Sequence, residues 1–211
     1  MKTEEIAAIN VAHRDRPPLD LVRWAVGQAG GRAIVSTNFR PYEAVLLHLV
    51  TQVQPDIPVL WVDHGYNRPA TYRHAADLIT RLRLNVKAYV PRMTTAHYDA
   101  LHGGAPDPTP ENEERIKAFS TVMKLEPFQR GMRELAPTVW FTALRRVQNL
   151  NRAGLDLVAD DQRTQQVASA ATQGLGQRQR EGIVREGQRA AAVHVARELV
   201  EHEDLGQTPL G

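Results

Sequence analysis

Short apolar runs alternate along the chain with longer segments in which apolar residues recur at helical spacing. Four runs have the length and composition of buried strands: 32–36, 58–63, 85–90 and 138–142. Helical spacing marks the segments 19–26, 41–53, 69–82 and 126–135. Strands that alternate with helices through short connections predict an α/β fold, a Rossmann-like parallel sheet sandwiched by helices and built from right-handed crossovers.

The pattern weakens in three places. Residues 103–114 are rich in Gly, Pro and acidic residues and predict a loop, whereas 155–158 predicts a fifth strand. After Gln162 the chain has no aromatic residue and no strand pattern, although an amphipathic helix near 178–203 is compatible with the sequence. We therefore expect a nucleotide-binding domain over 1–160 and a divergent, helical or disordered tail over 161–211.

Composition excludes several classes of protein. The 211 residues contain no cysteine, which excludes disulfides, Cys-ligated zinc, iron–sulfur clusters and thiol catalysis within them. The eight His form no constellation, so we expect no metal. No apolar run reaches 18 residues and no apolar signal core follows the N-terminus, so we expect a cytoplasmic protein without a membrane span. We also expect no nucleic-acid partner.

The turn after the first predicted strand is the first candidate for chemistry. It has the sequence Ser36-Thr-Asn-Phe-Arg-Pro-Tyr-Glu43. A strand-to-helix turn presents free backbone N–H groups and the positive end of a helix dipole, which suit an anion. The turn lacks both the Gly-Lys-Ser/Thr of a P-loop and the glycines of the dinucleotide fingerprint. The alternative is an ordinary capped helix.

Three further motifs carry polar or charged residues. Asp63-His-Gly-Tyr66 follows the second strand, Lys124-Leu-Glu-Pro-Phe-Gln-Arg130 begins a helix, and Ala143-Leu-Arg-Arg-Val-Gln148 follows the fourth strand. Alone, each is also compatible with a tight turn, a solvated helix start or surface charge. The carboxyl ends of parallel strands share one sheet edge. We therefore expect these residues to border one cleft: Ser36, Asn38, Asp63, Gly65, Arg145 and Arg146.

Together the four motifs resemble the phosphoadenylyl-sulfate (PAPS) and adenylyl-sulfate reductases of the adenine nucleotide α-hydrolase-like superfamily. Ser36-Thr-Asn-Phe39 is similar to the family's Ser-Thr-Ser/Ala-Phe-Gly, and Asp63-His-Gly-Tyr66 to its Asp-Thr-Gly-Tyr. Lys124-Leu-Glu-Pro127 is similar to Lys-Val-Glu-Pro, and Ala143-Leu-Arg-Arg146 to Gly-Leu-Arg-Arg. The matches run in order from about residue 32 to 158.

The resemblance implies roles for these residues. The Ser36–Phe39 turn would bind the phosphosulfate or α-phosphate, the strand end near Asp63 and Gly65 would border adenosine, and the basic residues would hold phosphates and sulfate. The implied substrate-binding residues are Ser36, Thr37, Asn38, Phe39, Asp63, Gly65, Lys124, Glu126, Arg130, Arg145, Arg146 and Arg152. The implied ligand is an adenosine phosphosulfate-type nucleotide.

The chain departs from the family at the reaction itself. Family members attack the sulfate sulfur with a cysteine thiolate near the C-terminus, in a Glu-Cys-Gly-Leu/Ile-His stretch, and this chain has no cysteine. It therefore has no catalytic residue of that kind and no iron–sulfur cluster, which places it closer to the cluster-free PAPS branch. Arg40 stands where the family has Gly. The sequence after about residue 160 is explained either by a frameshift or by a genuine replacement helix.

Two functional hypotheses follow from the resemblance. The first is a reductase of assimilatory sulfate reduction, which would convert PAPS to sulfite with thioredoxin as reductant and partner. Such a reductase would be inactive with this sequence, because the catalytic cysteine is missing. The second is a non-catalytic adenine-nucleotide-binding protein with no bound cofactor. An ATP-pyrophosphatase-type ligase is disfavoured because the Ser36–Tyr42 turn lacks that class's glycines and aspartate. The choice between PAPS and adenylyl sulfate stays open, as does a homodimer.

Overall fold

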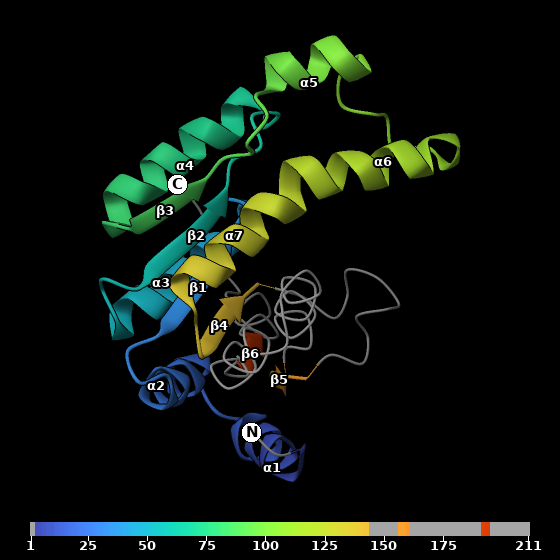
Figure 1. Cartoon of the computed structure of the whole chain (residues 1–211). Coiled ribbons are helices and arrows are strands. Elements are labelled where there is room, and N and C mark those ends of the chain that lie inside the picture. The colour runs from blue at the N-terminus through green and yellow to red at the C-terminus, as the bar shows by residue number, and fades with distance from the viewer. Residues whose placement is uncertain (1–2, 144–155, 161–190, 195–211) are drawn as a thin grey trace, which may run out of the picture.

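The computed structural model of the chain describes residues 3–143, 156–160 and 191–194 (Figure 1). The helices are α1 (Thr3–His13), α2 (Pro18–Gln28), α3 (Glu43–Val53), α4 (Pro69–Leu82), α5 (Thr95–His102), α6 (Glu113–Ser120) and α7 (Glu126–Leu135), with a 3-10 turn η1 (Pro110–Asn112) and a π-helical turn η2 (Thr121–Leu125). The strands are β1 (Ala33–Thr37), β2 (Pro58–Val62), β3 (Asn85–Tyr89), β4 (Val139–Thr142), β5 (Val158–Asp160) and β6 (Ala191–His194).

The described strands form one sheet in the order β3-β2-β1-β4-β6-β5. Neighbouring strands from β3 to β6 are parallel, and β5 pairs antiparallel with β6 at the edge. The chain moves outward from β1 through β2 to β3 and then returns to the other side of β1 with β4. The α/β fold with a parallel sheet flanked by helices is therefore confirmed.

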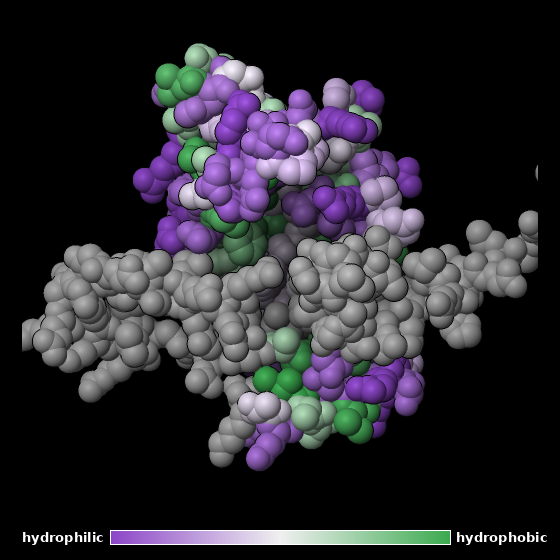
Figure 2. All heavy atoms as spheres, turned by 90° about the vertical axis from the view of Figure 1, so that its right-hand side faces the viewer, coloured by the Kyte–Doolittle hydropathy of each residue, from purple (hydrophilic) through white to green (hydrophobic). Residues whose placement is uncertain are grey.

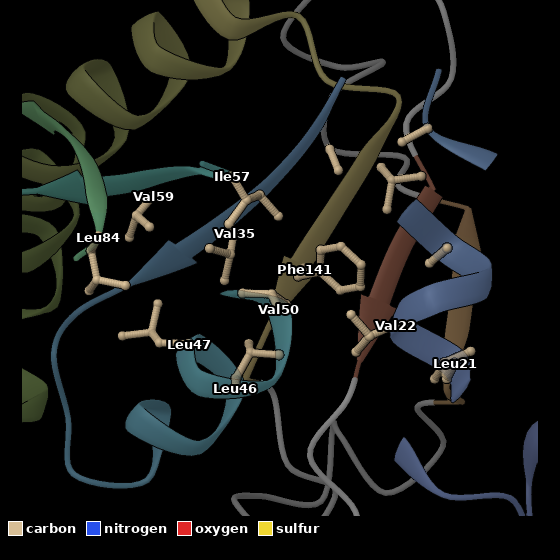
Figure 3. Packing of buried hydrophobic residues seen from close by; sticks show 14 of the residues in the cluster. Leu21, Val22, Val35, Leu46, Leu47, Val50, Ile57, Val59, Leu84 and Phe141 are labelled. Carbon is tan, nitrogen blue, oxygen red and sulfur yellow. The ribbon is translucent and has the colours of Figure 1, made fainter. Parts of the chain in front are cut away.

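Residues of the central strands β1, β2 and β4 alternate between two apolar layers. Val35, Val59 and Phe141 belong to the larger cluster, which includes residues of α2 and α3 (Figure 3) and Ala75 of α4. Their neighbours along the strands, among them Ile34 and Leu60, belong to a second cluster that includes Met132 of α7 and packs against the opposite face. Because both faces are covered, the strands read as continuous apolar runs, which explains why the sequence reveals them.

Two predictions for the second half of the chain are wrong. The fifth strand lies at Val158–Asp160 rather than 155–158, and it is antiparallel. A strand, β6, forms at Ala191–His194 inside the segment in which the sequence showed no strand pattern and was compatible with a helix near 178–203. Four residues are enough for a strand when β4 and β5 supply partners on both sides, and this pairing leaves no periodic signal in the sequence. The rest of the predicted tail over 161–211 lies outside the described residues.

Other helices were not evident in the sequence pattern. The predicted loop over 103–114 contains η1, which Pro110 begins, and α6 follows from Glu113, where Lys117 pairs with Glu113 and Glu114. Nothing in the pattern indicated α1 or α5. The α1 helix is held by tertiary contacts, because the buried Asn10 side chain donates to the carbonyl of Val158 and accepts from its N–H.

Candidate functional site

The polar turns after β1 and β2 lie at the same edge of the sheet. Thr37 stands opposite Trp61 in the parallel register, so Asn38 and Asp63 follow at neighbouring strand ends. The end of β4 lies on the other side of β1, and the indole Nε1 of Trp140 donates to Ser36 Oγ at 2.8 Å. The predicted convergence is thus confirmed for the strands. The predicted cluster of Arg145, Arg146 and Arg152, which follows β4, lies outside the described residues.

The turn after β1 is organised by the carboxylate of Glu43. Its Oε2 accepts from Thr37 Oγ1 at 2.8 Å, from the Asn38 N–H at 2.6 Å and from the Arg40 N–H at 3.3 Å. Thr37 Oγ1 in turn accepts from the Phe39 N–H at 2.9 Å. The turn therefore presents clustered donors, as predicted for an anion site, and they are directed at a side chain of the same protein.

Phe39 anchors this turn in the core. Its side chain is 1% exposed, and its ring meets that of Trp61 edge-on with centroids 5.0 Å apart. Its backbone has φ 53°, a left-handed conformation that is uncommon for a residue with a Cβ. Burial of the ring holds the backbone there, and the Asn38 N–H consequently turns toward Glu43.

Asp63 organises the turn after β2. Its Oδ1 accepts from the Gly65 N–H at 3.0 Å and from the Tyr72 hydroxyl at 2.7 Å. Burial, together with this bond to Asp63, raises the pKa of the Tyr72 hydroxyl. Asp63 thus links the end of β2 to the first turn of α4.

His64 is a polar residue of this edge that the sequence reasoning did not single out. Its Nδ1 accepts from the Tyr66 N–H at 3.1 Å, which leaves the proton of the neutral ring on Nε2. Burial and the positive charge of Lys124 lower the pKa of His64, so the ring is neutral at physiological pH. The structure therefore offers a neutral imidazole at the edge, within the electrostatic reach of Lys124.

The segment from α5 to α6 packs on this turn through aromatic residues. The Tyr66 hydroxyl donates to the Asp99 carboxylate, and burial together with this bond raises the pKa of Tyr66 to about 12. The Tyr66 and Phe119 rings meet with centroids 5.4 Å apart, and Lys124 Nζ lies 5.3 Å from the Phe119 ring centroid. Away from these contacts, the α5–α6 end of the molecule is mostly hydrophilic in Figure 2.

Gly65 permits the close approach of α5. It has φ +76°, and a Cβ there would overlap Thr95 Cγ2. We expect Gly65→Ala to destabilise the protein by about 2–3 kcal/mol, because a left-handed conformation and an overlap add together. Gly103→Ala is the matched control, since Gly103 has φ +72° and open space around it, and it should cost only about 1 kcal/mol.

Chemical denaturation of both glycine variants measures this difference. Adding Thr95→Ala to Gly65→Ala removes the Thr95 Cγ2 methyl group that the new Cβ would overlap, and it should recover part of the lost stability. Equal costs for Gly65→Ala and Gly103→Ala would show that the contact with Thr95 is unimportant.

Glu126 and Arg130, both predicted to bind substrate, contact each other. Arg130 Nε donates to Glu126 Oε1 at 3.0 Å, and its Nη2 donates to the Val90 carbonyl at 2.7 Å. Arg92 approaches the same Glu126 oxygen at 3.3 Å. Hydrogen bonding from Arg130 lowers the pKa of Glu126. This arrangement ties α7 to the end of β3 and uses several of the Arg130 donors that a phosphate would need.

Lys124 lies in the π-helical turn between α6 and α7. The Glu126 N–H donates to the carbonyl of Thr121, five residues earlier. Pro127 has no N–H for the carbonyl four residues before it, and the wider turn accommodates this gap. In this turn the Nζ of Lys124 lies over the ring of Phe119, five residues earlier. This placement depends on an irregularity that the apolar pattern does not encode.

Glu43 is the main residue that the sequence reasoning missed. It is the first residue of α3, and its carboxylate reaches back to the N–H of Arg40; an acidic residue in the first turn of a predicted helix was the available signal. In the described parts of the chain, no three His, Asp or Glu come together as a metal site would require. Nor does any described helix have the length and apolar character needed to cross a bilayer.

Comparison with known proteins gives consistent matches. The family model described as "Phosphoadenosine phosphosulfate reductase domain" matches residues 32–186, which extends the resemblance beyond residue 158, where we expected it to end. A phosphoadenosine 5'-phosphosulfate reductase of Synechococcus sp. is 38% identical over 72% of this chain and 65% of its own length. One from Vibrio parahaemolyticus is 37% identical over 75% of this chain and 61% of its own. The chain thus spans less than two thirds of either relative.

A solved structure shares the fold. The crystal structure of a PAPS reductase from Candida auris, in a phosphate complex, superposes with a TM-score of 0.63 at 18% identity, over 88% of this chain and 87% of the other. The family match reaches residue 186, and the choice between a frameshift and a genuine replacement after about residue 160 stays a prediction.

Proposed function

The chain belongs to the phosphoadenosine phosphosulfate reductase domain family, and from this premise we propose that it binds an adenine nucleotide bearing a phosphate or phosphosulfate group. The binding site is the carboxyl edge of β1, β2 and β4. The observation that carries the proposal is the parallel register, which brings the polar turns after β1 and β2 side by side next to the end of β4. Ligands of open parallel sheets bind at such an edge.

Within this proposal the residues take different parts. The turn from Ser36 to Phe39 faces the phosphate or phosphosulfate, and the turn at Asp63 and Gly65 borders the adenosine. Lys124 supplies a positive charge toward the same edge, because its Nζ lies over the Phe119 ring, which packs against Tyr66 of the turn after β2. Arg145, Arg146 and Arg152 complete the charge around the phosphates. Glu126 and Arg130 support the site by fixing α7 against β3 rather than by contacting the ligand.

We further propose that these 211 residues bind the nucleotide but do not reduce its sulfate group. The reaction implied by the family proceeds through a cysteine thiolate, and the chain has no cysteine. The alternative, a reductase of cytoplasmic sulfate assimilation with thioredoxin as its reductant and a homodimer as its assembly, rests on the family alone. Release of sulfite separates the two, because nucleotide binding is common to both.

Calorimetric titration of the full chain with adenosine 3′,5′-bisphosphate, AMP and adenosine tests the binding proposal. We expect Lys124→Gln to weaken the affinity for AMP about tenfold or more and to leave adenosine unaffected, because a charge-assisted bond contributes about 1.5–3 kcal/mol. Lys117→Gln is the matched control, since Lys117 pairs with Glu113 and Glu114 on exposed α6. Absence of binding by all three compounds would reject the proposed function.

A further inference from the structure

The oxygen atom Oε2 of Glu43 collects three donors of the turn after β1. The shortest contacts are those from the Asn38 N–H at 2.6 Å and from Thr37 Oγ1 at 2.8 Å, and the Arg40 N–H adds a third at 3.3 Å. Two backbone N–H groups and a hydroxyl converging on one anionic oxygen form the arrangement by which a strand-to-helix turn holds an oxyanion. Glu43 is the anion that the turn holds.

A nucleotide phosphate at this turn would compete with the Glu43 carboxylate. Each N–H carries one proton and donates one strong bond, so the donors that face Glu43 do not serve a second oxygen at full strength. Two anionic oxygens at one site also repel each other, and the repulsion is stronger near the protein than in bulk water. A phosphate therefore gains the donors of this turn only when Glu43 leaves them.

We propose that Glu43 is a specificity-determining residue of the nucleotide site, an internal anion that lowers the affinity of the turn after β1 for phosphate and sulfate groups. This inference rests on the proposed function. In the chain as it stands, adenosine recognition and Lys124 supply most of the affinity for AMP, and the turn contributes little. Removal of the Glu43 charge makes the turn available to the ligand's oxyanion.

The variant Glu43→Gln separates the effect of the negative charge from that of the hydrogen bonds that the side chain accepts from the turn. Glutamine keeps the length of the side chain and an acceptor oxygen, so it can accept hydrogen bonds from the same donors without the negative charge. We expect the affinity for AMP to rise about tenfold in Glu43→Gln while the affinity for adenosine stays unchanged. Glu114→Gln, which removes the same charge from exposed α6, should change neither.

Titration calorimetry of the three proteins with AMP and adenosine gives the answer. An unchanged or reduced affinity of Glu43→Gln for AMP, with adenosine binding intact, would overturn the inference and leave Glu43 as a helix cap. If no adenosine compound binds any of the proteins, the proposed function itself has failed. These two failures are distinct because only the second abolishes the adenosine signal.

A second measurement uses orthophosphate and does not depend on nucleotide binding, and its wild-type arm needs no variant. In ¹⁵N-labelled wild-type chain the amide resonances of Asn38 and Arg40 should stay in place as millimolar orthophosphate is added, since Glu43 already holds these N–H groups. In Glu43→Gln the same resonances should shift in a saturable way. A saturable shift of both amides in the wild-type chain would also overturn the inference.

Discussion

The purified chain should release no sulfite from PAPS in the presence of reduced thioredoxin, although it binds adenosine 3′,5′-bisphosphate. The family reaction begins with attack by a thiolate on the sulfate sulfur, and none of the 211 residues is a cysteine. Hydroxyl and imidazole groups of the site are much weaker nucleophiles toward sulfur at neutral pH. Loss of a covalent nucleophile commonly lowers kcat by several orders of magnitude, so the expected result is turnover at the background rate.

The assay follows sulfite over time with an intact reductase as the positive control. Adenosine 3′,5′-bisphosphate should bind the chain under the same buffer conditions, which shows that the absence of turnover does not come from unfolded protein. Turnover within tenfold of the intact reductase would mean that the chemistry proceeds without a cysteine. The binding-only proposal would then have to be abandoned.

Phe39→Ala should be the most destabilising single change in the turn after β1. The ring is 1% exposed and packs edge-on against Trp61, so its removal exposes a cavity where the turn meets the core. Phe→Ala changes in cores cost about 3–5 kcal/mol, which corresponds to a fall in Tm of roughly 10 °C for a chain of this size. The loss also frees the backbone of Asn38 and Arg40, so the affinity for AMP should change with it.

Thermal and chemical unfolding measure this effect. Phe39→Leu keeps most of the buried volume and should cost about half as much, whereas Leu101→Ala removes an apolar side chain that is 61% exposed and should cost at most about 0.5 kcal/mol. A cost for Phe39→Ala as small as that for Leu101→Ala would show that the Phe39 ring does not anchor the turn.

The family assignment came from polar residues at fixed places between apolar runs. The Ser36–Phe39 turn, the Asp63–Tyr66 turn and the Lys124–Pro127 stretch are each short and ambiguous alone, and their order along the chain made them specific. The comparison with known proteins confirmed the family over residues 32–186. Roles in substrate binding stay predictions, for the described residues as for Arg145, Arg146 and Arg152.

The local sequence determined the sheet from β1 to β4 and the helices that cover it. A strand covered on both faces, such as β2, is apolar along its length, and a helix such as α4 keeps one apolar face, so both leave a recognisable pattern in the sequence. The same alternation predicted which ends of the strands share an edge, since the carboxyl ends of parallel strands in one sheet all lie at the same edge.

Only the tertiary structure decided what the polar groups at that edge contact. Arg130 faces Glu126 and the Val90 carbonyl, and the donors of the turn after β1 face Glu43. Nor did the sequence reveal β6, whose four residues form a strand because β4 and β5 lie on either side of it. The physical reason is common to these cases: a hydrogen bond or an ion pair depends on distance and direction, which burial patterns do not record, and a side chain acquires its partner only when the chain has folded.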